Sequence, residues 1–475
     1  MSDMLNDIAD NVKQPERVLP NADAWMAAAR QKIEDAVKNN ANMGNLENLI
    51  AQELQVMGRS LLAYAVQKRA NNEPLRCPDC QQSLKVQKHL RERNVNSQFG
   101  PINVSRSYGY CAICSQYVYP ADRALGLQEK ASASPRVQEI CALMVLESPA
   151  GQAEANVRRL TGLNLGQATM HREARRQGLR ALRLREKDET LSTTIEGIDR
   201  LAARASNAPR PHTLVIEIDA WNIRERDFWG ETEKRRTKGE DISRWHWVYT
   251  GTVFRLDQRG KTNSGRAMIT ERGYVATRRG LESFERQLYA EALQRGLREA
   301  KNVLVLADGA IWIWNLADNI FYGATQRIDL WHVHEHLWDI ANELYGQGSE
   351  EAKQWVRPLL NHLKKRKDGA LDVIENLQQL RENLNPLTKK QTEHLEKQIA
   401  YLTNHQDRMD YKEAAACNQP LGSGAIESTC AQYQCRFKRT GQFWSIEGDE
   451  AFLALSTLHR NGRWHLLFPH DRKLE

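Results

Sequence analysis

Two short apolar runs, each ending in an aspartate, stand out in the hydrophobic pattern of this chain. Residues 303–307 are continuously apolar and Asp308 follows them at once, while the run at 213–220 carries Asp219 close to its end. A short apolar run with polar ends is typical of a strand that is buried on both faces of a sheet. We therefore predict two buried strands that deliver carboxylates to the edge of a sheet.

The segments around these runs predict the rest of a mixed sheet. Alternating, β-rich sequence at 243–256 and 265–276 indicates a second and a third strand, and helical spacing over 280–300 indicates a helix. We expect the first and fourth strands of this series to be neighbours, so that Asp219 and Asp308 lie side by side.

Helical patterns fill the two ends of the chain. Residues 1–70 have apolar positions at helical spacing, with a break at 38–45, and we expect them to pack on another surface or on a second copy. Charged helical periodicity over 335–412 predicts an insertion after the second aspartate. The Gly-rich turn at 422–424 then predicts a helix that carries Glu427.

Composition and charge bound the class of protein. The chain has 475 residues, of which 41% are hydrophobic and 27% charged, with a net charge of +7. This is the composition of a soluble protein with several domains, and the mild basic excess does not by itself identify a nucleic-acid binder. The sequence has no apolar stretch near the ~20 residues that span a membrane and no secretory signal pattern. We expect a cytoplasmic protein without a membrane partner.

Four of the eight cysteines form two CxxC pairs, Cys77 with Cys80 and Cys111 with Cys114, with 30 residues between the pairs. Two such turns complete a tetrahedral Zn²⁺ site. Alternation over 102–110 predicts strands between them, which would make a zinc ribbon with structural Zn²⁺. The alternative is four unrelated buried cysteines, which this spacing disfavours.

Residues 132–190 have the pattern of short helices. Pro135 opens the first, a second ends in the turn at 161–164, and an arginine-rich helix follows. This is the helix-turn-helix arrangement, whose second helix lies in the major groove of DNA. The alternative is a solvated basic face. We expect DNA contacts from Gln167, Thr169, His171, Arg172, Arg175 and Arg176.

We predict that Asp219, Asp308 and Glu427 meet and hold Mg²⁺ or Mn²⁺ for phosphoryl transfer on DNA. Two hard cations about 3.5–4 Å apart stabilise both ends of an in-line displacement, and a few carboxylates suffice to bind them. Each aspartate taken singly is better explained as a turn or helix-cap acid, but the matched pair with a third acid favours a metal site.

Two further sets of residues lie near these acids in the sequence. Asp329 and His332 precede His334 and His336, but alternating histidines cannot all share one helical face. Instead of a zinc site we favour a strand end that enters a helix, with Asp329 and His332 buried as core support. The basic and aromatic residues after Glu427 suit a helix that lies along a DNA backbone. They are Arg436, Lys438, Arg439 and Trp444.

We therefore expect eight regions along the chain. They are a helical N-terminal region (1–70), a zinc ribbon (71–128), a helix-turn-helix region (129–190), a linker (191–211), the first part of an α/β core (212–334), an all-helical insertion (335–412), the last part of the core with the catalytic glutamate (413–465) and a tail (466–475).

The order of these features resembles the bacterial insertion-sequence transposases of the DDE class. The likeness is to the ISKra type, which has an N-terminal zinc ribbon, and to the Mutator-like transposases. It covers residues 75–465, and residues 1–70 match nothing in it. The motifs that carry it are CPDC, CAIC, YPADRALGL, EID, LADGAIWIWN, DLWHVHEHLW, GSGAIES and RFKRTGQFW.

The resemblance implies an RNase H-like mixed sheet interrupted by an all-α insertion. It implies Asp219, Asp308 and Glu427 as the catalytic triad, and Asp329 with His332 as the D-x2-H feature after the second aspartate. The implied activity is cleavage at element ends and strand transfer into target double-stranded DNA, with Mg²⁺ or Mn²⁺.

Two other functions fit the same residues. One is a DNA-binding regulator with an inactive core, against which an intact set of three acids argues. The other is a structure-specific nuclease, which would cut branched DNA without needing element ends. Because pairing two ends needs at least two active sites, the transposase interpretation also predicts a homo-oligomer associated with the nucleoid.

Overall fold

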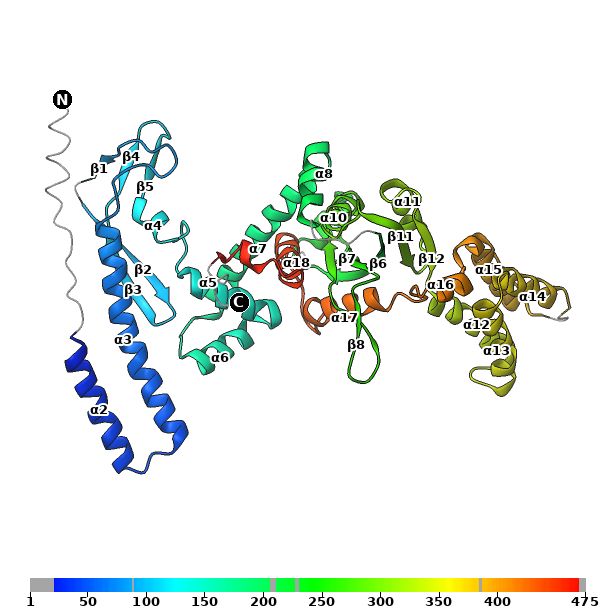
Figure 1. The fold of residues 1–475 in the computed structure, drawn as a ribbon, viewed down its shortest axis with the longest axis horizontal. Helices are drawn as coiled ribbons and strands as arrows, with labels where there is room; N and C mark the ends of the chain where they lie inside the picture. The colour runs from blue at the N-terminus through cyan, green and yellow to red at the C-terminus, as the bar shows by residue number, and fades with distance from the viewer. Residues whose placement is uncertain (1–20, 88, 206–210, 227–229, 384–386, 470–475) are drawn as a thin grey trace. The chain divides into compact units, whose positions relative to one another are not determined.

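The computed structural model describes residues 21–87, 89–205, 211–226, 230–383 and 387–469 of the chain. They form two compact units (Figure 1): the first runs up to Gly178 and takes in the segment from His465 onward, and the second is Leu179–Trp464. The α/β multidomain class expected from the sequence is confirmed. Within the described ranges, no helix combines the length and apolar character needed to cross a membrane.

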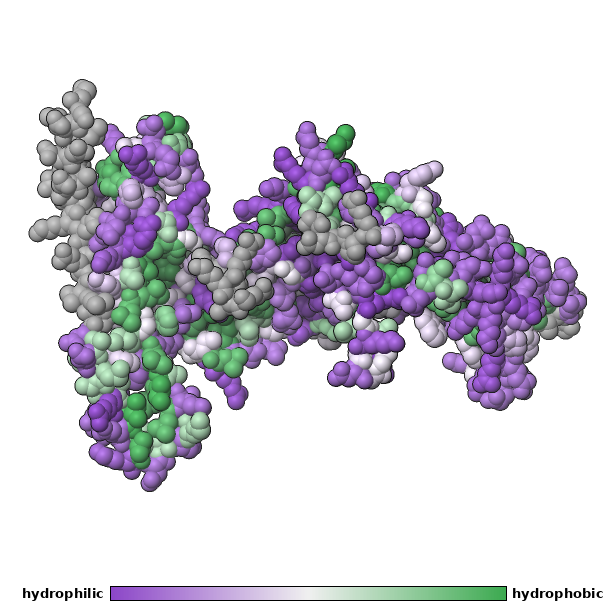
Figure 2. Space-filling model, in the orientation of Figure 1, coloured by the Kyte–Doolittle hydropathy of each residue, from purple (hydrophilic) through white to green (hydrophobic). Residues whose placement is uncertain are grey.

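The first unit begins with a hairpin of two helices, α2 (Ala22–Lys38) and α3 (Met43–Asn71). Each starts where an asparagine side chain, of Asn21 or Asn42, accepts the backbone N–H of the third residue further on. This confirms helices in 21–70 with a break between them; residues 1–20 lie outside the described part. Figure 2 shows apolar residues exposed along α3. The packing of this hairpin on another surface or on a second copy stays a prediction.

A β-hairpin of β2 (Arg91–Ser97) and β3 (Gly100–Arg106) lies along α3, and a second, three-stranded sheet holds β1 (Lys85–Val86), β4 (Gly109–Cys111) and β5 (Gln116–Val118). The alternation predicted over 102–110 is present, with Ile102 and Val104 buried. However, the strand breaks at residues 107–108, so its two parts belong to different sheets.

Three helices follow the short helix α4 (Pro120–Ala124) in the order expected of a helix-turn-helix. They are α5 (Pro135–Glu147), α6 (Ala150–Thr161) and α7 (Gln167–Leu191). Ser134 caps α5, and α6 ends at Gly162, whose φ of 70° lies in the left-handed region that favours glycine. The part of α7 up to Gly178 belongs to the first unit.

The second unit is built on a five-stranded mixed sheet. Its strands are β6 (His212–Arg224), β7 (Trp245–Arg255), β10 (Gly273–Thr277), β11 (Ala300–Ala307) and β12 (Thr325–Ile328). They lie in the order β10-β7-β6-β11-β12, with the first three antiparallel and β6, β11 and β12 parallel. The first and fourth strands are therefore neighbours, as predicted.

Helices cover this sheet. They are α10 (Leu281–Gln294), α11 (Ile311–Ile320), α17 (Gly424–Phe437) and α18 (Ile446–Arg460). A small hairpin of β8 (Arg259–Lys261) and β9 (Ala267–Ile269) and a short helix α9 (Thr232–Thr237) lie in the connections. The core between sheet and helices contains Leu214, Ile216, Val305 and Phe284, all at 0% exposure. Burial of both faces explains why the strands read as apolar runs.

The all-helical insertion is confirmed, with an earlier start than predicted. Its helices are α12 (Leu330–Tyr345), α13 (Glu350–Lys365), α14 (Gly369–Asn383), α15 (Lys389–Asn404) and α16 (Tyr411–Ala416). The first helix begins at Leu330 instead of 335 because the Asp329 side chain caps it, accepting the N–H of Trp331.

The linker predicted over 191–211 is wrong for residues 195–205, which form α8 (Ile195–Ala202) and a 3₁₀ turn. Ile195, Ile198 and Leu201 recur at helical spacing, a pattern that the neighbouring small and charged residues conceal. Leu201 is fully buried against Leu293 of α10. Residues 206–210 lie outside the described part.

Candidate active site and metal centres

The three parallel strands of the second unit bring three aspartates into one row. The register pairs Leu306 of β11 with Glu217 of β6, and Ala307 of β11 with Ile328 of β12. Continued to the strand ends, it places Asp308 opposite both Asp219 and Asp329. Asp308 and Asp329 directly follow their strands, whereas β6 continues beyond Asp219 to Arg224, so the sequence placed the end of that strand too early. The shared register nevertheless puts the three aspartates side by side.

Glu427 reaches the same edge from α17, which packs on β6 and β7. Burial raises the pKa of Asp219, and the charge of Asp308 raises it further. Burial also raises the pKa of Glu427, and the charges of Asp329 and Asp219 add to this effect. The charges of neighbouring acids therefore act on both carboxyl groups, but among the described residues Asp219 and Asp308 do not belong to a group with metal-ligand spacing.

One group of three side chains in this cluster has metal-ligand spacing. Ligand atoms of Asp329, His332 and Glu427 all lie within 4.8 Å of one another. The sequence interpretation gave Asp329 and His332 a supporting role. Asp329 fits it, with 0% exposure, but the His332 side chain is 37% exposed and is not a core residue.

The other two histidines of α12 lie elsewhere, as their spacing predicted. His334 is buried and its ring packs edge-on against Trp331, whereas Nδ1 of His336 lies 2.6 Å from Oε1 of Gln398. Only His332 of the three belongs to the group with metal-ligand spacing.

The sequence interpretation missed Glu217, which is 1% exposed and lies two residues before Asp219 on β6. Its Oε2 accepts the N–H of Ile426, 2.8 Å away, beside Glu427 on α17. Burial raises the pKa of Glu217 to about 8, which the donated N–H partly opposes. The sequence signal for this residue was a glutamate inside an apolar strand run. Its contact with Ile426 connects β6, which carries Asp219, to α17, which carries Glu427.

The backbone after Asp308 is also held in place. The Tyr401 hydroxyl of α15 donates to the Asp308 carbonyl oxygen at 2.8 Å. Gly309 has a φ of 101°, and a Cβ there would lie 2.5 Å from the Tyr401 oxygen. A glycine is therefore required at the turn that follows the aspartate.

The four-cysteine cluster of the first unit has the geometry of a zinc site. The sulfur atoms of Cys77 and Cys114 lie 3.8 Å apart and those of Cys80 and Cys111 lie 3.4 Å apart. Zinc–sulfur bonds of about 2.3 Å in a tetrahedron separate the sulfurs by about 3.8 Å. The N–H of Cys114 lowers the pKa of Cys111 to about 7, whereas the neighbouring Cys80 thiol raises the pKa of Cys114 to about 12. The cluster is consistent with structural zinc.

The predicted DNA-contact residues of the helix-turn-helix region differ in their exposure. Gln167, His171 and Arg172 are exposed, while Thr169 and Arg175 are half-buried. Arg176 donates to the carbonyl oxygens of residues 129 and 130 and pairs with buried Glu173. Gln167, His171 and Arg172 are therefore the most exposed of the predicted DNA-contact residues, and Arg172 also donates to the hydroxyls of Ser132 and Thr169.

Lys438 and Arg439 are exposed at the end of α17, and Lys438 lies 5.8 Å from the ring centre of Trp245. Arg436 is half-buried over Trp444, 5.1 Å from its ring centre. Trp444 itself is only 7% exposed, and its Nε1 donates to the Phe437 carbonyl oxygen. Its indole packs in the core, so we leave Trp444 out of the DNA surface proposed below.

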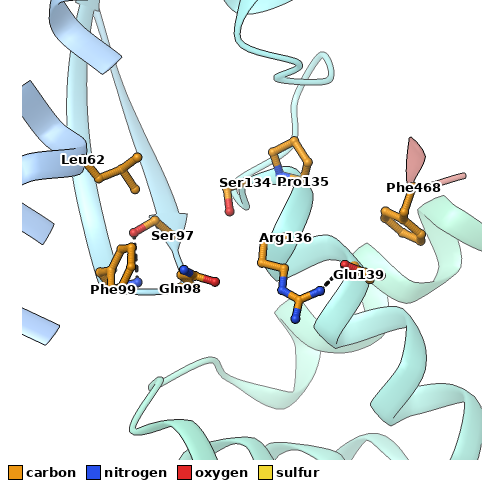
Figure 3. Close-up of a pocket in the computed structure, with 9 residues that line it drawn as sticks. All are labelled: Leu62, Ser97, Gln98, Phe99, Ser134, Pro135, Arg136, Glu139 and Phe468. Atoms are coloured by element: carbon orange, nitrogen blue, oxygen red, sulfur yellow. Dashed lines mark hydrogen bonds and ion pairs between the residues drawn. The ribbon is translucent and has the colours of Figure 1, made fainter. Parts of the chain in front are cut away.

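A cavity of about 340 Å³ lies within the first unit (Figure 3). Leu62, Phe99 and Phe468 give it an apolar lining, and Arg136 pairs with Glu139 at its wall at 2.6 Å. Phe468 is buried, so the predicted tail at 466–475 begins inside the fold. The lining offers no set of metal ligands.

Replacing Cys77 with serine should release the zinc, because a hydroxyl is a poor substitute for one of four thiolates. Metal analysis of the purified chain should find about one Zn²⁺ per wild-type chain and clearly less in the variant, with weaker binding to DNA ends. Cys417→Ser, at an exposed cysteine outside the cluster, is the control and should keep its zinc. Unchanged zinc in Cys77→Ser would refute the ribbon.

Glu217→Leu should destabilise the second unit more than Glu217→Gln. The glutamine can still accept the N–H of Ile426, whereas leucine leaves a buried donor without a partner, at about 1–3 kcal/mol. Thermal unfolding should show an apparent Tm on the order of 5 °C lower for the leucine variant. Equal Tm values for the two variants would mean that this contact does not hold α17 in place.

No protein-family model matches this chain, and neither does any curated protein.

Proposed function

We propose that this protein is a metal-dependent DNA transposase of the DDE class, which binds the ends of an insertion sequence, cuts them and joins them to target DNA. The observation that supports this best is the row of Asp219, Asp308 and Asp329 on three adjacent parallel strands, with Glu427 across from it. Four carboxylates at one sheet edge repel one another and so destabilise the fold, which favours a functional reason for their presence.

The donor set fits hard divalent cations. Asp219, Asp308 and Glu427 offer carboxylate oxygens, which Mg²⁺ and Mn²⁺ prefer, and the cluster is open enough for several waters because Glu427 is exposed. Bound there, such ions would stabilise the charge that develops on a phosphodiester during in-line displacement. The chain's part is to hold these oxygens in fixed positions.

Fixed positions follow from the elements that carry the acids. Asp219 lies within β6, and Asp308 directly follows β11. Helix α17 is anchored by Glu217 and Asp329, which accept the N–H groups of Ile426 and Ser423 at 2.8 and 2.7 Å. Ligands on rigid strands and helices lose little freedom when the cation and the DNA arrive.

DNA binding is assigned to other parts of the chain. We assign contacts with base edges and phosphates to Gln167, His171 and Arg172, which are exposed at the start of α7, and further phosphate contacts to Lys438 and Arg439, which belong to the same unit as the acids. The zinc ribbon adds a further candidate surface. Because two ends must be held at once, we propose a homo-oligomer that contributes at least two active sites.

The two alternatives differ in what they require of the acids. A regulator with an inactive core does not need four carboxylates converging at one edge, and their mutual repulsion argues against it. A structure-specific nuclease would use the same acids, so only the choice of substrate separates it from a transposase.

Asp308→Asn should abolish strand cleavage without preventing DNA binding, because the amide removes a charged ligand and keeps the size of the side chain. The substrate is a DNA fragment that carries the gene's own flanking ends, incubated with Mg²⁺ or Mn²⁺. Wild-type protein should nick at the element boundary, and a branched DNA without these ends should stay intact.

Asp318→Asn is the matched control, since Asp318 is an exposed aspartate on neighbouring α11 that bonds Gln326. It should cut like wild type. Binding without cleavage by wild type, with either metal, would favour the regulator, and cleavage of branched DNA in preference to the ends would favour the nuclease.

Arg172→Ala should weaken DNA binding about equally for all sequences and reduce the slope of log K against log salt by about 1, as expected for one lost phosphate contact. Binding is measured by fluorescence anisotropy over a salt series. Arg30→Ala, an exposed arginine on α2 paired with Glu34, should leave the slope unchanged. An unchanged slope for Arg172→Ala would favour the solvated basic face.

A further inference from the structure

We infer that Asp329, His332 and Glu427 form a metal position with a nitrogen ligand, suited to a divalent first-row transition ion. This deepens the proposed function and rests on it in part, because the position shares Glu427 with the proposed catalytic set. The three ligand atoms come from the end of β12, the first turn of α12 and the first turn of α17.

The spacing of the three ligands suits one ion. Their atoms lie within 4.8 Å of one another. With bonds of about 2.1 Å in an octahedron, neighbouring ligands lie about 3 Å apart and opposite ones about 4.2 Å apart. A small inward movement of the exposed Glu427 side chain would therefore complete the position.

Asp329 keeps capacity for a ligand bond although it is fully buried. Its Oδ1 accepts the N–H of Trp331, and its Oδ2 accepts both the N–H and the hydroxyl of Ser423. A carboxylate has about four acceptor positions, so one remains. The three donors also fix the direction in which this carboxylate points.

Both carboxylate oxygens of Glu427 are available as metal ligands. Among the described residues, no donor hydrogen-bonds to its carboxylate, and its side chain stands at the surface of the cluster. Hydrogen bonds hold the Asp329 carboxylate in one orientation, whereas the Glu427 side chain can move toward a bound ion.

His332 has the setting of a metal-binding imidazole. Its Nδ1 lies 3.2 Å from Oε2 of Glu335, one turn further along α12. This carboxylate favours the proton on Nδ1 and leaves the lone pair on Nε2, the arrangement in which an outer carboxylate orients a metal-bound histidine. Among the histidines of α12, His332 alone has both a carboxylate partner and the ligand spacing.

The nitrogen donor sets this position apart from the oxygen ligands of Asp219 and Asp308. Imidazole binds first-row transition ions better than Mg²⁺, which takes oxygen ligands almost exclusively. The position should therefore hold Mn²⁺ or Co²⁺ more tightly than Mg²⁺, while a neighbouring ion between Asp219 and Asp308 would not have that preference.

The test uses Mn²⁺ as a paramagnetic probe on the full chain with its cysteine cluster already loaded with zinc. Pulsed electron paramagnetic resonance detects the ¹⁴N coupling of an imidazole bound directly to Mn²⁺. Wild-type protein should show this coupling. In His332→Asn it should disappear, and Mn²⁺ should bind at least about tenfold more weakly.

His334→Asn is the matched control, because it makes the same change two residues away on the other side of α12. It should keep the coupling and the affinity. Glu335→Gln should keep the coupling but weaken Mn²⁺ binding about tenfold, as loss of an orienting carboxylate does. Asp308→Asn should keep the coupling as well.

Wild-type Mn²⁺ without ¹⁴N coupling, or coupling that persists in His332→Asn, would overturn the inference. Neither result depends on DNA cleavage. Coupling together with no cleavage of any DNA would leave the metal position standing and remove the proposed function, and cleavage without coupling would do the reverse.

Discussion

The parallel pairing of β6, β11 and β12 is the constraint on which the site depends. A slip of one residue would move every side chain of a strand to the opposite face of the sheet, so the packing of particular side chains against the helices on each face holds the register. The same register aligns Asp219, Asp308 and Asp329, and so imposes repulsion between like charges. The fold offsets part of it locally, because each aspartate accepts a backbone N–H that follows it in the chain, from Ala220, Ala310 and Trp331 respectively.

Much of this arrangement could be predicted from the sequence, because short sequence patterns indicate the strands and the cysteine cluster. Apolar runs that end in Asp219 and Asp308 identify two neighbouring strands, and CxxC spacing identifies the cysteine cluster. The third row member, Asp329, was harder to place. It follows the four-residue strand β12, of which only Arg327 and Ile328 are buried, so no apolar run in the sequence predicts a strand before it. Its role became visible only through the register with β11.

Other features depended on tertiary packing that a single sequence does not encode in an obvious way. Trp444 lies among basic residues, which suggested a surface, yet its ring is covered by Phe437 and Phe452. His332 was expected to be buried beside Asp329, but the turn of α12 that carries it faces outward toward Glu427. In each case the burial depends on how helices pack against one another, which the local sequence pattern does not show.

Asp329 also explains how an all-helical insertion can interrupt the chain beside the row of acids. It caps α12, where the insertion begins, and it holds Ser423, where the insertion has ended. Leu330 donates its N–H to the Leu421 carbonyl oxygen at 2.9 Å, and Arg327 forms two hydrogen bonds with Asp410. The chain therefore leaves and re-enters the core at one place, where these hydrogen bonds hold the two ends of the insertion together. Because Asp329 and Glu217 accept N–H groups at the start of α17, these two residues set the position of Glu427, and the length of the inserted helices does not.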